Sequence, residues 1–313
     1  MVRAASLLVF CLASLGAAQP ITRLKPLCPE TPVCVAGQAQ AVIVAPQSLA
    51  EVAERLVEVL YQPIVDLKTD AITGAEALVR LRELDGSLMP PSEFIDIAED
   101  TGLINELGEW VLLESLRQVA DGRGAGIVDD GFTISVNVSV QRVNDGRMVT
   151  TVRDIVQKAG LPAERLVLEV TESTLITETD KIRATMQELR AFGPRLAVDD
   201  FGTRYSSLGY IQQFEFDVLK IDKSFVDGLG TGTNRQIGTA VLDLARELGV
   251  RTIAEGIETE VQDGVLRELG CRYGQGYLYD RPVPASLIEE HLRRAAVGSS
   301  TLAPVQRLGE ARS

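Results

Sequence analysis

Residues 61–81 read YQPIVDLKTDAITGAEALVRL, and the stretch holds two β-rich runs, at 61–67 and 72–81, with only four residues between them. A crossover connection between two parallel strands needs a dozen or more residues, so this pair cannot be a parallel crossover unit. We therefore expect one member of the pair to run antiparallel to the strands that follow.

Downstream of this pair, short apolar runs alternate with helical patterns. Further strands are expected at 132–140, 165–170, 195–200, 218–222, 251–256 and 274–279. Strands that alternate with helices indicate crossover units and a mainly parallel sheet. Eight strands over roughly 250 residues are typical of an α/β chain that folds as a TIM-like (β/α)8 barrel, here with one antiparallel strand near the start.

Two helices between these strands have clear ends. Residues 148–159 are amphipathic, and Gly160 follows them as a C-terminal cap. The second helix ends before Gly249 and carries apolar residues on one face, namely Ile237, Val241, Leu244 and Leu248.

Composition excludes several classes of function. The chain has 31 basic and 44 acidic residues, a net charge of −13, which argues against a polynucleotide partner. The single histidine, His291, lies in an amphipathic segment near the C-terminus and is expected on the surface. Sites that need a histidine base, a Ser-His-Asp triad or several histidine ligands are therefore disfavoured. The four cysteines match no zinc spacing, and a Cys28–Cys34 bridge stays open.

The chain divides into three expected parts. Residues 1–45 form a leader and linker, 46–295 the barrel, and 296–313 a loose tail. The first eighteen residues have a basic start, an apolar run and a small-residue end, as in a secretory signal peptide. A membrane anchor and a wrongly assigned start remain open as alternatives.

Polar residues recur at the ends of the expected strands. They are Glu76, Asn137, Glu169, Asp199, Asp200, Lys220, Glu255 and Gln275. The carboxyl ends of barrel strands meet at one mouth, so these side chains should gather there. Any one of them has an ordinary explanation, and for Glu172 helix capping is about as well supported as a function.

Together, seven oxygen-bearing side chains at one mouth need cations, because unpaired buried charges cost several kcal/mol each. Carboxylate and amide oxygens without histidine or thiolate suit Mg²⁺ or Mn²⁺. The adjacent Asp199 and Asp200 would let one carboxylate bridge two ions about 3.5–4 Å apart. Such a pair of ions suits phosphodiester hydrolysis.

At this point the sequence resembles a known family, the EAL-domain phosphodiesterases that hydrolyse cyclic di-GMP. The resemblance covers about residues 46–295 and rests on motifs in the family's order: YQPIVDL, EAL at 76–78 followed by Arg80, PSEFIDIAEDTGLI, NVS, EVTE, DDFGTRYSSL, KIDKSF, AEGIE and QGYLY. It implies a modified TIM barrel with an antiparallel strand near its start.

The resemblance also implies roles for residues at matching positions. One metal ion would be held by Glu76, Asn137, Glu169 and Asp199, and a second by Asp199, Asp200 and Glu255. Lys220, with Gln275, would position or deprotonate the attacking water. Gln62, Leu78 and Arg80 would contact the dinucleotide. Glu172 would brace the loop 201–208, which leads to a homodimer interface, and the product would be linear diguanylate.

The sequence departs from the family at two places. After Arg80 it has Leu81, Arg82, Glu83 and Leu84 where the family often has Trp-x-His-Pro, and it has Arg204 where glycine is common. The 45 upstream residues are too few for a GGDEF or sensor domain. Besides an active phosphodiesterase, two alternatives stay open: an EAL-type module that binds cyclic di-GMP without turnover, and an exported phosphodiesterase. A cytosolic messenger favours the cytoplasm over export.

Overall fold

The computed structural model describes residues 56–297, apart from 84, 145, 173, 175–179, 202–213 and 230–231. The described residues fall into two compact units, a small one (56–58 and 81–103) and a large one (59–80 and 104–297). The predicted leader and linker (1–45), the first ten residues of the predicted barrel part (46–55) and nearly all of the tail lie outside the described residues. The predicted start of the tail at 296 falls within the last helix, α13 (Ala285–Val297).

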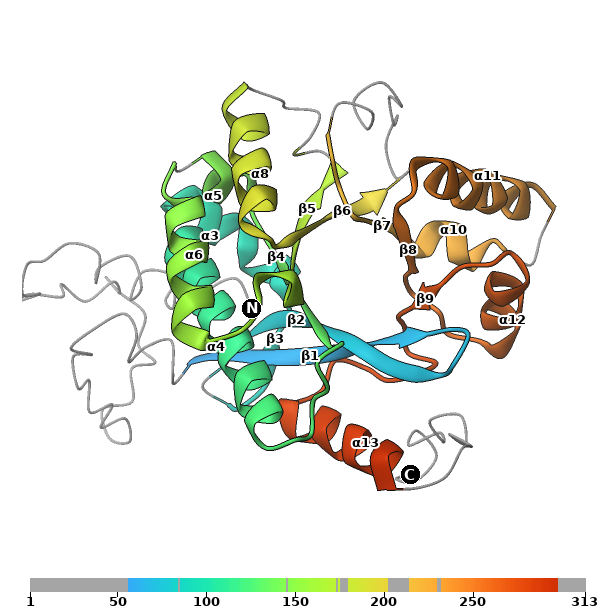
Figure 1. The fold of residues 1–313 in the computed structure, drawn as a ribbon, viewed down its shortest axis with the longest axis horizontal. Coiled ribbons are helices and arrows are strands. Elements are labelled where there is room, and N and C mark those ends of the chain that lie inside the picture. The colour runs from blue at the N-terminus through green and yellow to red at the C-terminus, as the bar shows by residue number, and fades with distance from the viewer. Residues whose placement is uncertain are drawn as a thin grey trace, which may run out of the picture. The chain divides into compact units, whose positions relative to one another are not determined.

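The large unit is built on a closed ring of eight strands (Figure 1). The ring order is β1 (Val57–Asp66), β9 (Tyr273–Gly274), β8 (Arg251–Ala254), β7 (Val218–Ile221), β6 (Arg195–Phe201), β5 (Leu166–Thr171), β4 (Thr133–Asn137) and β2 (Ala71–Arg82), and β1 pairs with β2 to close it. All neighbouring pairs from β2 through β9 are parallel. The predicted α/β barrel is confirmed.

Strand β1 runs antiparallel to β9, which confirms the expectation drawn from its short connection to β2. The connection is a tight turn in which the amides of Thr69 and Asp70 donate to the carbonyl of Asp66. The Asp66 side chain also accepts from the amide of Lys68 at 2.9 Å. A hairpin of this kind needs few residues, so β1 and β2 can be neighbours without a crossover helix.

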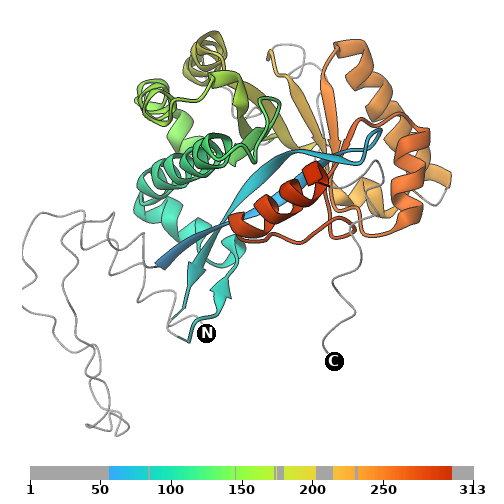
Figure 2. The same ribbon diagram turned by 60° about the horizontal axis from the view of Figure 1, so that its bottom comes forward.

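Helices surround this ring of strands in Figure 1. They are α4 (Ile104–Gly124), α5 (Val140–Asn144), α6 (Met148–Ala159), α8 (Asp180–Phe192), α10 (Lys223–Asp227), α11 (Gly232–Leu248), α12 (Glu260–Glu268) and α13. A short 3₁₀ turn, η2 (Ala163–Arg165), precedes β5. Figure 2 shows α13 lying alongside β1. None of the helices in the described ranges is both long and apolar enough to cross a bilayer.

The predicted helix ends are confirmed, and one predicted face is right only in part. Gly160 and Gly249 follow α6 and α11 in the left-handed conformation, with φ of +66° and +68°. On α11, Ile237 and Leu248 are 41% and 36% exposed, whereas Leu242 is 4% exposed. Val241 and Leu244 of the predicted face pack against the core, together with the buried Leu242 and Ala245, so the buried stripe is shifted away from the two ends of the predicted face.

The eighth predicted strand, 274–279, is also wrong in extent. Strand β9 ends at Gly274, and the amides of Tyr279 and Asp280 bond back to the carbonyl of Gly276. Residues 275–280 therefore form a turn that lies over Ile257, to which Gln275 and Leu278 are bonded through the backbone. The strand-like composition of QGYLY reflects packing in this turn and not membership of the sheet.

The small unit is formed around the end of β2. Leu81 and Arg82 pair with β3 (Leu88–Met89), which the sequence did not predict. A 3₁₀ turn, η1 (Pro91–Glu93), and helix α3 (Ile95–Thr101) follow, with Phe94 between them 2% exposed. Arg82 forms an ion pair with Glu58.

Apolar layers lie on both faces of the barrel strands, one toward the helices and one toward the barrel interior. The layer between strands and helices includes Ile134, Leu166 and Leu189, all 0% exposed. A smaller cluster fills the barrel interior with Ile64, Val167, Ala197, Val218 and Ile253. Side chains two residues apart on a strand share a face, so the residues that follow this interior cluster by two positions also face inward.

Candidate active site

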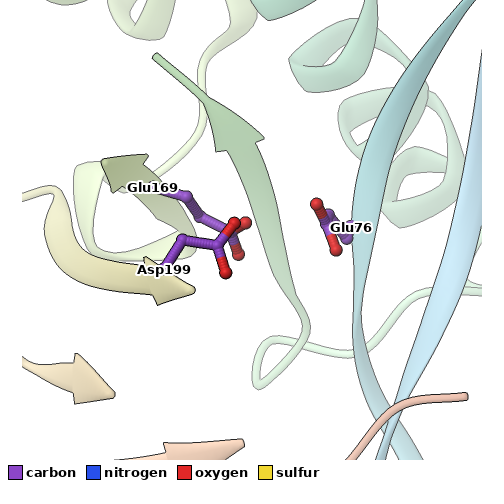
Figure 3. A group of neighbouring side chains, drawn as sticks. All are labelled: Glu76, Glu169 and Asp199. Carbon is purple, nitrogen blue, oxygen red and sulfur yellow. The ribbon is translucent and has the colours of Figure 1, made fainter. Parts of the chain in front are cut away.

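The predicted acidic residues lie together at the carboxyl ends of the strands. Positions 169, 199, 220 and 255 each follow a residue of the apolar interior cluster by two. Figure 3 shows Glu169 and Asp199 projecting from neighbouring strands with their carboxylates side by side, across from Glu76 on β2. Carboxylate oxygens of Glu76, Glu169 and Asp199 lie within 4.8 Å of one another, and so do those of Asp199, Asp200 and Glu255.

Lys220 on β7 lies at the centre of this cluster. Its Nζ is 2.6 Å from Oε2 of Glu169 and 2.7 Å from Oε1 of Glu255. It is also 3.3 Å from both Glu76 and Asp199. The Lys220 side chain is 1% exposed, so one buried ammonium faces four carboxylates and leaves an excess of negative charge.

A chain of amides holds the Glu76 carboxylate in place. The Nδ2 of Asn137 donates to one oxygen at 2.7 Å, and the Nε2 of Gln275 donates to the other at 2.7 Å. The same Gln275 nitrogen lies 2.9 Å from Oε1 of Gln62, whose own Nε2 donates to the carbonyl of Asp280. Gln275 follows β9 by one residue, not within a strand as expected, yet its side chain reaches the cluster.

The carboxyl groups of the cluster differ in the direction in which their pKa values are shifted. Burial raises the pKa of Glu169 well above its ordinary value, and the charges of Glu76 and Asp199 add to this effect. Burial likewise raises the pKa of Glu255, to about 8. For Glu76 burial also acts upward, but Lys220 and the bonds from Gln275 and Asn137 outweigh it and lower the pKa.

The same comparison for Lys220 shows that it is charged. Burial acts to lower its pKa, but the surrounding carboxylates outweigh burial and hold the pKa well above the ordinary value. The surrounding carboxylates therefore favour the ammonium form of Lys220, which donates to them. Crowded carboxyl groups with opposed pKa shifts are typical of functional sites.

Asp199 and Asp200 are oriented differently although they are adjacent. Asp200 has a φ of +54°, which is uncommon outside glycine, and its amide donates to Oδ1 of Asp199 at 2.9 Å. Burial raises the pKa of Asp200, and the charge of Asp199 raises it further. Backbone strain of this kind clusters at functional sites. It lets both neighbouring carboxylates face the cluster, where a regular strand would turn one away.

The residues fit divalent cations. The donor set consists of carboxylate and amide oxygens, as Mg²⁺ and Mn²⁺ prefer, and Asp199 belongs to both groups of clustered carboxylates. Oε1 of Glu169 is buried with no hydrogen-bond partner among the described residues. A buried carboxyl oxygen without a partner, within a donor set of this kind, is what a bound divalent cation would satisfy.

The other predicted site residues lie near the cluster or at its edge. Leu78 and Arg80 are half-buried and lie on the same face of β2 as Glu76. Burial lowers the pKa of Arg80, and the nearby Tyr277 and Glu76 act against this effect. Glu172 is buried just after β5. The loop that it was expected to brace, with Arg204, lies outside the described residues except for Phe201.

Sequence reasoning missed one pair beside the site. Nε2 of His291 on α13 lies 3.0 Å from Oδ2 of Asp280, and the His291 side chain is 12% exposed. The expectation that His291 lies on the surface is wrong, because α13 packs that face toward the turn after β9. The sequence offered one indication of this pair: Asp280 follows QGYLY directly and lies shortly before the helix that contains His291.

Comparison with known proteins identifies relatives of this chain. Residues 47–282 match the family model described as EAL domain. The chain is 38% identical over 237 residues to the cyclic di-GMP phosphodiesterase NbdA of Pseudomonas aeruginosa, covering 75% of this chain and 30% of NbdA. It is 36% identical over 233 residues to the signaling protein YkoW of Bacillus subtilis, covering 74% of this chain and 29% of YkoW.

A solved structure, the MucR phosphodiesterase of P. aeruginosa in complex with c-di-GMP, has a TM-score of 0.71 and 37% identity, covering 75% of this chain and 95% of that one. This chain spans less than a third of the length of NbdA and of YkoW. The match of the family model covers most of the chain and includes every residue of the cluster around Lys220. The chain belongs to the EAL domain family.

Proposed function

We propose that the protein hydrolyses cyclic di-GMP to linear diguanylate in a reaction that depends on divalent metal ions. One observation carries the proposal: four carboxylates surround Lys220 at one mouth of the barrel, and a chain of three amides holds one of them, Glu76. Relatives that support it include a cyclic di-GMP phosphodiesterase and a phosphodiesterase solved with c-di-GMP.

In this proposal two ions, Mg²⁺ or Mn²⁺, are held by two sets of ligands that share Asp199. The first set adds Glu76, Asn137 and Glu169, and the second adds Asp200 and Glu255. When bound, such ions neutralise the phosphodiester charge and lower the pKa of a water molecule. The excess negative charge around Lys220 would then be compensated.

The protein's own residues supply position and charge. Lys220 is held protonated between Glu169 and Glu255, so we assign it the positioning of the attacking water and not its deprotonation. Gln275 bonds to Glu76 and to Gln62, which couples the cluster to a group proposed to contact substrate. Attack by water forms one P–O bond and breaks one ester P–O bond, the water gives up a proton, and the leaving ester oxygen takes up a proton to become a hydroxyl.

Substrate contacts are proposed for Gln62, Leu78 and Arg80. Arg80 lies on β2 four residues after Glu76, and its guanidinium can present two donors to phosphate oxygens. Glu172 is proposed to brace the loop after Asp200, and that loop to form a homodimer interface. Because cyclic di-GMP is a cytosolic messenger, we place the barrel in the cytoplasm, with residues 1–45 as leader and linker.

The test is hydrolysis of cyclic di-GMP by the purified full chain, with Mg²⁺ or Mn²⁺, and with Glu76→Ala and Asp199→Ala beside the wild type. We expect linear diguanylate from the wild type and a loss of product in both variants. Glu289→Ala, which removes a half-buried carboxylate of α13 outside the cluster, is the matched control. Binding without product at any enzyme level would establish the alternative, a cyclic di-GMP binding module. Fractionation of tagged cells tests the location.

A further inference from the structure

The inward-facing positions of three barrel strands repeat one pattern of charge. Around β5 the residues read Arg165, Val167 and Glu169, and along β6 they read Arg195, Ala197 and Asp199. The segment through β8 repeats it with Arg251, Ile253 and Glu255. Residues two apart share a strand face, so an arginine layer and an acidic layer lie on opposite sides of the apolar interior cluster.

These arginines lie near one another at the amino ends of the strands. Burial, followed by the charges of Arg251 and Arg165, holds the pKa of Arg195 below its ordinary value. The backbone amide of Arg251 also donates to the carbonyl of Asp217, whose side chain accepts from the amide of Leu196 at 3.0 Å. Backbone bonds therefore fix the relative positions of the strands that carry Arg195 and Arg251.

The three guanidinium groups differ from most others in the protein. Within the part of the chain that the structure describes, Arg165, Arg195 and Arg251 have no ion pair, hydrogen bond or aromatic contact for the guanidinium. Most of the other described arginines form ion pairs with carboxylates. Arg165 and Arg195 are half-buried and Arg251 is exposed, so the three guanidinium groups are accessible to a ligand.

The nearest carboxylates do not neutralise them. Asp217 is shared between Arg190, at 3.3 Å, and the amide of Leu196. Glu215 forms its ion pair with Arg190 as well. The charge of Asp217 also acts on Arg195 and compensates it in part. The remaining positive charge of Arg165, Arg195 and Arg251 is open to a group outside these residues.

A cavity of about 490 Å³ opens beside Arg195. It lies between α8 and the segment that leads into β7, and its wall includes Arg190, Met186, Pro194 and Phe214. Arg183 and the carboxylates of Glu164, Glu215 and Asp217 also line it. Of the three arginines only Arg195 reaches its wall, and Arg165 and Arg251 are not among the lining residues. Its volume lies within the range of sites for small organic ligands, about 300–1,000 Å³.

We propose that Arg165, Arg195 and Arg251, with the cavity beside Arg195, bind a small anion that carries two or more negative charges on phosphate groups. Arginine forks match phosphate oxygens in pairs, and several charges on one ligand would relieve the repulsion among three cations. The apolar side chains of the cavity wall would accept an organic portion of the ligand. The site lies at the end of the barrel opposite the acidic cluster and does not depend on the proposed hydrolysis.

The test is calorimetric titration of the metal-free full chain, in EDTA and a phosphate-free buffer of low ionic strength, with pyrophosphate and separately with ADP. We expect binding of both probes, with tighter binding of ADP if the cavity holds the organic portion. Arg195→Ala and Arg251→Glu should each weaken binding by about tenfold or more, as expected for the loss of a charge-assisted contact. Arg195→Lys should fall between them and the wild type.

Arg293→Ala and Arg294→Glu on α13 make the same changes of charge at exposed, distant positions and should bind like the wild type. Glu76→Ala should also bind like the wild type, which separates this site from the acidic cluster. Melting temperatures verify that each variant is folded. Absence of binding in the wild type, or equal weakening in the α13 controls, would overturn the proposal.

Discussion

The ammonium of Lys220 lies 2.6 Å from the carboxylate of Glu169, and both residues are 1% exposed. Glu76, Asp199 and Glu255 approach the same ammonium. Lys220 therefore holds together carboxyl groups from four other strands and their ends. Without a cation at this place the mouth of the barrel would carry uncompensated buried charge.

Lys220→Met should destabilise the metal-free protein by about 3–5 kcal/mol, because removing one partner leaves the buried carboxylates without compensation. Added Mn²⁺ should reduce this deficit, since the ion supplies the missing charge. Urea unfolding in EDTA and in Mn²⁺ measures both effects. Lys223→Met, at an exposed pair with Asp227 and Glu258, should change stability by less than about 1 kcal/mol in either condition. A Lys220→Met protein as stable as the wild type in EDTA would contradict this prediction.

Glu169→Gln should weaken metal binding more than the loss of any group that only surrounds the metal ligands. Its orphaned oxygen Oε1 is the one that we expect a cation to use, and the amide keeps the size of the side chain. Loss of groups around metal ligands costs about 10–100-fold in affinity, so loss of a ligand should cost at least about 100-fold. The measurement is the Mn²⁺ concentration that restores hydrolysis, and Glu215→Gln at an exposed ion pair is the control. An unchanged Mn²⁺ requirement in Glu169→Gln would remove Glu169 from the set of ligands.

Much of the fold and the cluster could be predicted from local features. The short connection between 67 and 72 required an antiparallel strand, and polar residues at strand ends required a common mouth in any parallel barrel. Extents were less predictable. Residues 275–279 have the composition of a strand, but bonds to Gly276 and Ile257 turn them out of the sheet. The face of α11 depended on which side the barrel approaches, which helical spacing alone does not determine.

The central position of Lys220 and the arginine layer show another limit. The spacing Arg165, Val167, Glu169 is visible in the sequence, and it recurs at 195–199 and 251–255. Its meaning depends on ring order, because β5, β6 and β8 must be brought around one interior before the charges form layers. That closure is a long-range property that no local pattern contains.

Arg267 on α12 should stabilise the closure of the barrel. Its guanidinium donates to the carbonyl of Leu67 and pairs with Asp70 at 2.6 Å, both in the turn between β1 and β2. It also pairs with Asp263 at 2.8 Å, which in turn accepts from the hydroxyl of Tyr279 at 2.7 Å. Arg267→Ala should cost about 1–2 kcal/mol, the value of charge-assisted bonds discounted for partial exposure.

Denaturant unfolding measures the effect of Arg267→Ala, and hydrogen exchange should show faster exchange of the amides in the β1–β2 turn. Arg235→Ala is a suitable comparison. It removes an ion pair between Arg235 on α11 and Glu268 on α12, and both side chains are well exposed. We expect that variant to lose less than about 1 kcal/mol. Equal losses of unfolding free energy in the two variants would show that the contacts of Arg267 with the β1–β2 turn add no stability beyond that of an exposed ion pair.

His291→Leu should act on substrate binding through the turn after β9. The ring holds the Asp280 carboxylate at 3.0 Å, and the carbonyl of the same residue accepts from Gln62 at 3.2 Å. Loss of the bond should cost about 0.5–1.5 kcal/mol of stability. Gln62 is a proposed substrate contact and is not one of the proposed metal ligands. We therefore expect KM for cyclic di-GMP to rise while kcat changes little. His291→Gln, which keeps a donor, should recover most of the lost affinity, and a matched fall of kcat in both variants would place His291 outside this chain of contacts.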